Sequence, residues 1–265
     1  MSTLSRDGAP RSAVPESPAP GLDLVRLVDT SVLETTPFEH VCLEGAFPAA
    51  LYRRLLDNLP ETPRYRELRH PEAMQADGHS ARRKFYLYPE HVWLLPAGQR
   101  AVWLDLARLL RSPALQEAFK RKFRGALERR FGRPLDRLTF YPVPILVRDL
   151  GGYRLGIHAD TLRKAITVQF YLPRDDSQIQ LGTIFHEGPQ GAAAQRTRRL
   201  PFRPATGYAF PVVPDGSWHS VAPTTAADGP RDSLMLTYYV QDGLGGWLAQ
   251  RAKRLAVFLG YGLRR

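Results

Sequence analysis

Apolar and polar positions follow two different periods along the chain, and the change comes near residue 138. Upstream, Phe47 to Leu59 has apolar residues at helical spacing and ends before Pro60. From Ala101 to Phe131 the same spacing predicts two helices that are separated near Ser112-Pro113, a usual helix start. Helical support is therefore expected mainly over residues 47–133.

Three other segments of the front half have weaker patterns. Leu24 to Val28 and Phe38 to Leu43 are each predicted to form a short strand. The stretch from Pro63 to Pro96 has no clear period and is interpreted as a loop. Because it contains Arg82-Arg-Lys84, it is also a candidate lid for an anionic substrate.

From residue 138 onward, apolar and β-branched runs recur between Gly, Pro and Asp residues, a pattern typical of an antiparallel sandwich or barrel. The predicted strands are Leu138–Val147, Tyr153–His158, Ala165–Leu172, Leu181–Phe185, Gly207–Val212, Trp218–Val221 and Leu234–Val240. The β-core is thus expected mainly over residues 138–240. An amphipathic helix from Leu244 to Leu259 is expected to pack on the sheet. No linker divides these elements, which predicts one domain over residues 22–265.

Composition narrows the class of protein. The chain has 265 residues, of which 43% are hydrophobic and 24% charged, as in soluble globular proteins. Residues 1–21 are rich in Pro, Ser and Ala, without the apolar run of a secretory signal, and are expected to be disordered. No apolar window reaches the length of a membrane span. The one cysteine, Cys42, excludes an internal disulfide and a thiolate metal cage, so a cytoplasmic protein is expected.

The formal net charge of +11 leaves several partners open. A basic surface can meet nucleic acid, an anionic membrane, an acidic partner or an anionic substrate. Because no aromatic residues alternate with the basic ones and no binding motif accompanies them, no specific nucleic acid is expected.

Two histidines and an aspartate form the strongest chemical signal. In His158-Ala-Asp160, positions i and i+2 of a strand point to one face and can hold one ion. About sixty residues downstream, His219 lies in another strand-like run. Two histidines and one carboxylate occupy one face of an octahedron and leave three positions open, as in non-haem Fe(II) oxygenases. Alone, the triplet would be weak evidence; with His219 it predicts a metal site.

Arg231 and Ser233 follow twelve and fourteen residues after His219 and share a face of the last strand. A guanidinium matches a carboxylate in shape, and the serine adds a hydroxyl donor. The turn Ala222–Pro230 allows this strand to pair with the one bearing His219, which would place Arg231 near the metal. A dicarboxylate such as 2-oxoglutarate could then chelate iron at one end and meet Arg231 at the other.

These motifs together resemble the 2-oxoglutarate/Fe(II)-dependent oxygenases of the prolyl-4-hydroxylase-like group. The similarity covers most of residues 36–240, including Gly152 to Asp160, Lys164 to Pro173, Trp218 to Val221 and Arg231 to Tyr239. It implies a double-stranded β-helix (jelly-roll) core, with the cofactor Fe(II), the cosubstrate 2-oxoglutarate and O2. It also implies that His158, Asp160 and His219 bind the metal and Arg231 the distal carboxylate. Lysine is frequent at that last position in the group. Related halogenases have a small residue in place of the carboxylate, so Asp160 favours hydroxylation.

Other roles remain open at this stage. Tyr141 and Gln169, with Tyr171, lie on strands flanking the metal pair and are candidates for binding the cosubstrate. Thr167, Gln169 and Tyr171 share one face of their strand and Ile166, Val168 and Phe170 the other, which suits the apolar set to the space between sheets. The expected function is oxidation of a C–H bond in an amino-acid-like, peptidyl or secondary-metabolite substrate, free or carrier-tethered, with release of succinate and CO2. The alternatives are an inert jelly-roll module that binds or senses a metal, and a basic nucleic-acid-binding protein.

Overall fold

The computed structural model describes residues 22–69, 74–189 and 196–241, and positions 248, 251, 252, 254–256 and 258–260. The predicted tail over residues 1–21 lies outside this part of the chain. None of the helices in the described part is long and apolar enough to cross a membrane.

Most helices of the described chain come before residue 132, and most strands come after residue 139. The helices are α1 (Leu24–Thr30), α2 (Ala49–Asp57), α3 (Pro89–Val92), α4 (Ala97–Leu110), α5 (Pro113–Lys122) and α6 (Arg124–Phe131). The strands are β1 (Val41–Leu43), β2 (Arg66–Glu67), β3 (Arg82–Tyr86), β4 (Phe140–Asp149), β5 (Leu155–His158), β6 (Lys164–Tyr171), β7 (Thr183–His186), β8 (Thr197–Arg199), β9 (Gly207–Pro211), β10 (Trp218–Val221) and β11 (Arg231–Val240).

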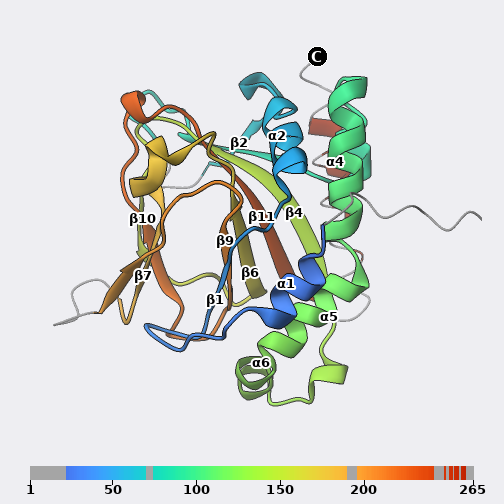
Figure 1. The fold of residues 1–265 in the computed structure, drawn as a ribbon, viewed down its shortest axis with the longest axis vertical. Helices are drawn as coiled ribbons and strands as arrows, with labels where there is room; N and C mark the ends of the chain where they lie inside the picture. Colours follow the sequence, from blue (N-terminus) through green and yellow to red (C-terminus); the bar gives the residue numbers. More distant parts are fainter. Residues whose placement is uncertain are drawn as a thin grey trace, which may run out of the picture.

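These strands form two antiparallel sheets, and the helices cover the outer face of the larger one (Figure 1). The seven-stranded sheet has the order β1-β9-β6-β11-β4-β3-β2, and the four-stranded sheet the order β5-β10-β7-β8. From β4 to β11 the chain therefore passes repeatedly between the two sheets. This is the order of a double-sheet jelly roll and confirms the predicted fold class of a mainly β core with flanking helices.

The two largest apolar clusters of the described residues fill most of the space between the three layers. The larger packs the helices, including Leu55, Trp103 and Phe119, against the outer face of the seven-stranded sheet. The smaller lies between the sheets and contains Phe185 and Phe210. Ile166, Val168 and Phe170 of β6 belong to the larger cluster, so they face the helices. The prediction that this set fills the space between the sheets was wrong, because the helices supply a second apolar surface that the strand pattern does not reveal.

Other local predictions are corrected by the structure. Leu24–Val28 lies in helix α1, because Asp23 caps the N-terminus by accepting from Arg26 N and because Leu24 and Val28, four residues apart, are buried on one face. Arg82 to Lys84 is part of strand β3, which pairs with β4, so it is not a mobile lid. Strand β8 had no counterpart among the predicted strands.

The strands that bear His219 and Arg231 do not pair with each other. β10 lies in the four-stranded sheet between β5 and β7, whereas β11 lies between β4 and β6 in the other sheet. The expected β10–β11 pairing was wrong, because the chain between them crosses from one sheet to the other. His219 and Arg231 can come near each other only because the two sheets pack face to face.

The C-terminal helix predicted over Leu244 to Leu259 is only partly described. The described positions between 248 and 260 are helical. Leu248, Leu255 and Leu259 remain more than half exposed, while the ring of Phe258 lies 6.0 Å from that of His91. This segment therefore packs near α3 and not by its predicted leucine stripe on the sheet.

Candidate active site

His158, Asp160 and His219 meet at the open edge of the space between the sheets. Each offers one ligand atom, and these atoms lie within 4.8 Å of one another. His158 at the end of β5 and His219 in β10 are direct cross-strand partners, and their ring centroids are 4.2 Å apart. The strand register thus brings together two residues that are 61 positions apart in sequence, as a common metal site requires.

Hydrogen bonds with the backbone fix the orientation of both imidazole rings. His158 Nδ1 lies 3.0 Å from the carbonyl oxygen of Gly156, and His219 Nδ1 lies 2.8 Å from that of Ser217. Because a carbonyl oxygen only accepts, each Nδ1 must donate, and the lone pair of each ring is on Nε2. Burial, opposed by Asp160, lowers the pKa of His219 to about 4, so this ring is neutral at pH 7 and suited to bind a metal.

Asp160 is held as a carboxylate. Lys164 Nζ donates to its Oδ1 at 2.5 Å, and Thr167 Oγ1 donates to its Oδ2 at 2.6 Å. Burial alone would raise the pKa of Asp160, but Lys164 and His219, with the hydrogen bonds, hold that pKa well below its usual range. The three side chains therefore present two imidazole nitrogens and one anionic oxygen.

A cavity of about 560 Å³ adjoins the three side chains. Its walls come from the inner faces of β3, β4, β6, β9 and β11 in one sheet and from β5 and β10 in the other. Its volume falls within the usual range of small-molecule sites, about 300–1,000 Å³. Four cationic side chains line it, Arg82, Lys84, Lys164 and Arg254, and Asp160 is the one carboxylate among the described lining residues.

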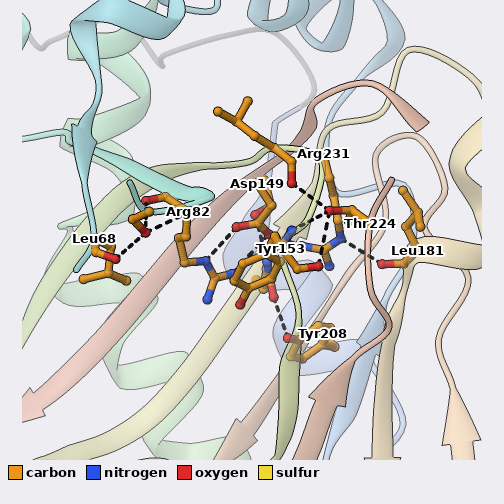
Figure 2. A network of polar contacts seen from close by, with 12 residues as sticks. Leu68, Arg82, Asp149, Tyr153, Leu181, Tyr208, Thr224 and Arg231 are labelled. Carbon is orange, nitrogen blue, oxygen red and sulfur yellow. Dashed lines mark hydrogen bonds and ion pairs between the residues drawn. The ribbon is translucent and has the colours of Figure 1, made fainter. Parts of the chain in front are cut away.

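Arg231 belongs to a buried cross-strand cluster at one end of the larger sheet. Asp149 of β4 is the register partner of both Arg231 of β11 and Arg82 of β3. Figure 2 shows the two arginines pointing toward Asp149 from opposite sides, with Tyr153 and Tyr208 nearby. Arg82 Nε donates to Asp149 Oδ1 at 2.7 Å, and Arg231 Nη1 donates to Oδ2 at 2.9 Å.

This cluster holds more positive than negative charge. Two guanidinium groups share one carboxylate, which leaves one net positive charge, and Asp149 and Arg231 are fully buried. Arg231 Nε donates to the carbonyl oxygen of Leu181, but Nη2 is buried and has no hydrogen-bond partner among the described residues. An unpaired buried donor is costly, so Nη2 is an unused donor of this cluster, although Arg231 is not among the described residues that line the cavity.

Gln169 and Ser233 lie between this cluster and Asp160, on the inner faces of neighbouring strands. Gln169 Nε2 donates to Ser233 Oγ at 2.7 Å, and the hydroxyl of Tyr208 donates to Gln169 Oε1 at 2.5 Å. Ser233 is the register partner of Tyr171, and Thr237 that of Thr167. The inner face of β6 therefore contributes, in order, Thr167 beside Asp160, then Gln169, then Tyr171 beside Arg231.

Tyr141 lies at the opposite end. It is the register partner of Tyr239, eight residues along β11 from Arg231, and the two tyrosine rings stack with centroids 5.5 Å apart. Tyr141 lines the cavity, but on the other side of the Thr237 position from the arginine cluster. Its contact with the cosubstrate therefore stays a prediction.

Sequence reasoning missed Asp149 altogether, and with it Arg82 as the second guanidinium that pairs with Asp149 beside Arg231. Arg82 was assigned to a lid, and Asp149 closes a strand whose predicted end was Val147. Arg82 and Asp149 each lie on a strand, on the face that points toward the other sheet. Only the pairing of β3, β4 and β11 brings these two residues together with Arg231.

A second group of possible ligands lies outside this cavity. Glu34, His40 and Cys42 also bring one ligand atom each within 4.8 Å of the others. The guanidinium of Arg198, however, donates to Glu34 and lies 3.7 Å from the sulfur of Cys42. A cation already lies among these atoms, so the group is less suited to a metal than the His-Asp-His set.

Comparisons with known proteins gave matches only among solved structures. No protein-family model and no curated protein matches the chain. A prolyl hydroxylase from Trichoplax adhaerens, in complex with a hypoxia inducible factor peptide fragment, is 12% identical over 82% of this chain and 87% of its own, with a TM-score of 0.49. A prolyl-4-hydroxylase from Pseudomonas putida is 15% identical over 82% and 98%, with a TM-score of 0.48. An oxidoreductase of the 2OG-Fe(II) oxygenase family from Burkholderia pseudomallei is 21% identical over 76% and 84%, with a TM-score of 0.41. Because these TM-scores lie below 0.5, we base the functional proposal on the side chains of the site.

Proposed function

We propose that this protein is an Fe(II)- and 2-oxoglutarate-dependent oxygenase that oxidises a C–H bond of a small-molecule or carrier-tethered substrate. The products from the cosubstrate would be succinate and CO2. The observation that supports this most directly is the pairing of two features: an open His-Asp-His set, and a buried arginine cluster with an unpaired donor.

The donor set fits iron(II). Two imidazole nitrogens and one carboxylate oxygen suit this metal and leave open positions for exogenous ligands. His158, Asp160 and His219 would hold it, with their orientations fixed by Gly156 O, Ser217 O and Thr167 Oγ1. Bound there with 2-oxoglutarate, iron supplies the activation of O2, which no side chain of the protein provides.

The arginine cluster fits the distal carboxylate of 2-oxoglutarate. Its net positive charge is buried, and Arg231 Nη2 is an unused donor. Asp149 accepts a hydrogen bond from Nη1 of Arg231, and Leu181 O accepts one from Nε. The plane of the guanidinium is therefore fixed before the ligand binds. Ser233 accepts from Gln169, which leaves its own hydroxyl proton available to donate.

The protein's own contribution is then orientation and exclusion of water. Lys164 and Thr167 keep Asp160 deprotonated and aligned, and the backbone carbonyls keep both Nε2 lone pairs directed toward the metal position. The apolar inner faces of β4 and β11, with Val143, Ile145 and Met235, limit access of water to the reacting C–H bond.

Anaerobic addition of Fe(II) and 2-oxoglutarate tests the proposal. We expect a visible charge-transfer band from the chelate, which His158→Ala and His219→Ala should abolish because each removes a ligand. Arg231→Gln should keep the band but require at least tenfold more 2-oxoglutarate, since it removes a buried charged donor. His79→Ala, an exposed histidine outside the cavity, is the matched control and should behave like the wild type.

The absence of a band in the wild-type protein at saturating iron and 2-oxoglutarate would contradict the proposal. Metal binding that depends on His158 and His219 but gives no such band would instead support a metal-binding module without oxygenase activity.

A further inference from the structure

The part of the cavity around Tyr141 and Tyr239 is lined mainly by tyrosines and apolar side chains. Tyr86 and Tyr88 stack with centroids 5.7 Å apart and an angle of 5° between their planes. Tyr141 and Tyr239 form a second stacked pair with an angle of 18°. Both pairs belong to one apolar cluster, and all four rings line the cavity. Aromatic faces at such spacing favour a flat apolar ligand.

Alternating positions of two neighbouring strands complete this wall. Val143 and Ile145 of β4 lie beside Tyr141, and Met235 of β11 is the register partner of Ile145. None of these three side chains offers a strong hydrogen-bond donor or acceptor. Against these three side chains the hydroxyl groups of a polyol such as a sugar would find no partners, and only the tyrosine hydroxyls of the wall could bind them.

The same region contains positive charge from β3 and from the C-terminal helical segment. Lys84 follows Arg82 and precedes Tyr86 on the inner face of β3, and its Nζ lies 5.3 Å from the centre of the Tyr86 ring. The guanidinium of Arg254 lies 4.2 Å from the centre of the Tyr88 ring and is paired with Glu90. Burial and the adjacent Arg66 lower the pKa of Lys84, and an anion beside this amine would offset both effects.

We propose that the substrate subsite binds a small organic anion with a planar apolar ring, its carboxylate or equivalent anionic group meeting Lys84 and its ring lying among Tyr86, Tyr88, Tyr141 and Tyr239. That this substrate presents its reacting C–H bond to the metal rests on the proposed function. The binding of the anion itself does not rest on the proposed function, because it depends only on side chains of this wall. A cationic ligand is disfavoured, since Asp160 is the only carboxylate of the described lining and is engaged by Lys164 and Thr167.

The test measures binding of four probes by isothermal titration calorimetry, both to the metal-free protein and, without oxygen, to the protein with Fe(II) and saturating 2-oxoglutarate. The probes are 3-phenylpropionate, 3-phenylpropylamine, 3-cyclohexylpropionate and gluconate. The amine changes the charge and the cyclohexyl compound the planarity, while gluconate keeps the carboxylate and replaces the apolar ring with hydroxyl groups. We expect 3-phenylpropionate to bind at least tenfold more tightly than each of the other three.

Variants of Lys84 and Tyr86 then assign the contacts. Lys84→Met keeps the apolar stem but removes the charge, and should weaken 3-phenylpropionate binding about tenfold. Lys84→Arg keeps the charge and should restore most of the affinity. Tyr86→Leu should weaken the phenyl probe several-fold and leave 3-cyclohexylpropionate nearly unchanged. Arg108→Gln, which removes a charge from the exposed face of α4, is the control and should change nothing.

Three results would overturn this assignment: equal or tighter binding of the amine, equal binding of gluconate, or an unchanged affinity in Lys84→Met. A rise in the 2-oxoglutarate requirement of Lys84→Met, with no effect on the probe, would instead place Lys84 with the cosubstrate. If the charge-transfer band forms but the probes do not discriminate, this inference fails while the proposed function stands. If the metal-free protein distinguishes the probes in a way that depends on Lys84, but no charge-transfer band forms, this inference stands while the proposed function fails.

Discussion

At the scale of single residues, β4 and β11 carry two carboxylate–arginine pairs, one on each face of the sheet. Asp149 is enclosed by Arg82 and Arg231 on the inner face and has no exposed surface. On the outer face, Asp232 pairs with Arg148, and both side chains remain 11% exposed. Arg148 also donates to Pro60 O and Thr62 Oγ1, so it keeps partners if Asp232 is lost.

Asp149→Asn should therefore destabilise the fold far more than Asp232→Asn. Removing the Asp149 charge leaves two buried guanidinium groups facing each other without compensation, a change that typically costs about 3–5 kcal/mol. For Asp232→Asn we expect a loss nearer 1 kcal/mol, because Arg148 keeps its other hydrogen bonds. Urea unfolding followed by circular dichroism measures both, and equal losses would show that the inner cluster is not energetically distinct.

At the scale of elements, the faces of β6 separate packing from chemistry. Ile166, Val168 and Phe170 anchor the strand against the helices, and Thr167 and Gln169 face the cavity. The helices α4, α5 and α6 thus hold the outer side of the sheet that bears the site (Figure 1). The start of α5 is set by Ser112, whose Oγ accepts from Leu115 N, and by Pro113 in the first turn.

Ser112→Ala should lower the free energy of unfolding by about 1 kcal/mol, because it removes the cap from an otherwise unpaired N–H group. Ser112→Asp should retain the stability, since a carboxylate can accept the same hydrogen bond and interacts favourably with the helix dipole. Comparison of denaturant midpoints for the two variants checks this, and a stable Ser112→Ala would mean that Pro113 alone defines the helix start.

At the scale of the whole molecule, a ligand bound at the site contacts residues of both sheets. His158 and His219 belong to the four-stranded sheet, whereas Thr167, Gln169 and Arg231 belong to the seven-stranded one. A ligand that contacts both sheets binds the folded state and not the unfolded chain. Its binding free energy is therefore added to the stability of the fold.

A divalent metal with 2-oxoglutarate should accordingly raise the melting temperature by several degrees at about 100 times the dissociation constant, where the linkage amounts to about 2.7 kcal/mol. Co(II) or Zn(II) avoids oxidation during the measurement. His219→Ala should lose this shift, and His79→Ala should keep it. A shift of equal size in His219→Ala would indicate binding elsewhere on the protein.

The sequence by itself determined the features that depend on neighbouring residues. The helical periods over residues 47–59 and 101–131 and the alternation after residue 138 predicted most elements, because side-chain direction repeats every 3.6 residues in a helix and every two in a strand. The i, i+2 spacing of His158 and Asp160 has the same local origin. Only the tertiary structure decided which face of β6 meets the cavity, that β10 and β11 lie in different sheets, and that Arg82, Asp149 and Arg231 share one register position. These outcomes depend on packing between segments that are far apart in the sequence. Helices and a second sheet compete there for the same apolar faces, and no local period contains that information.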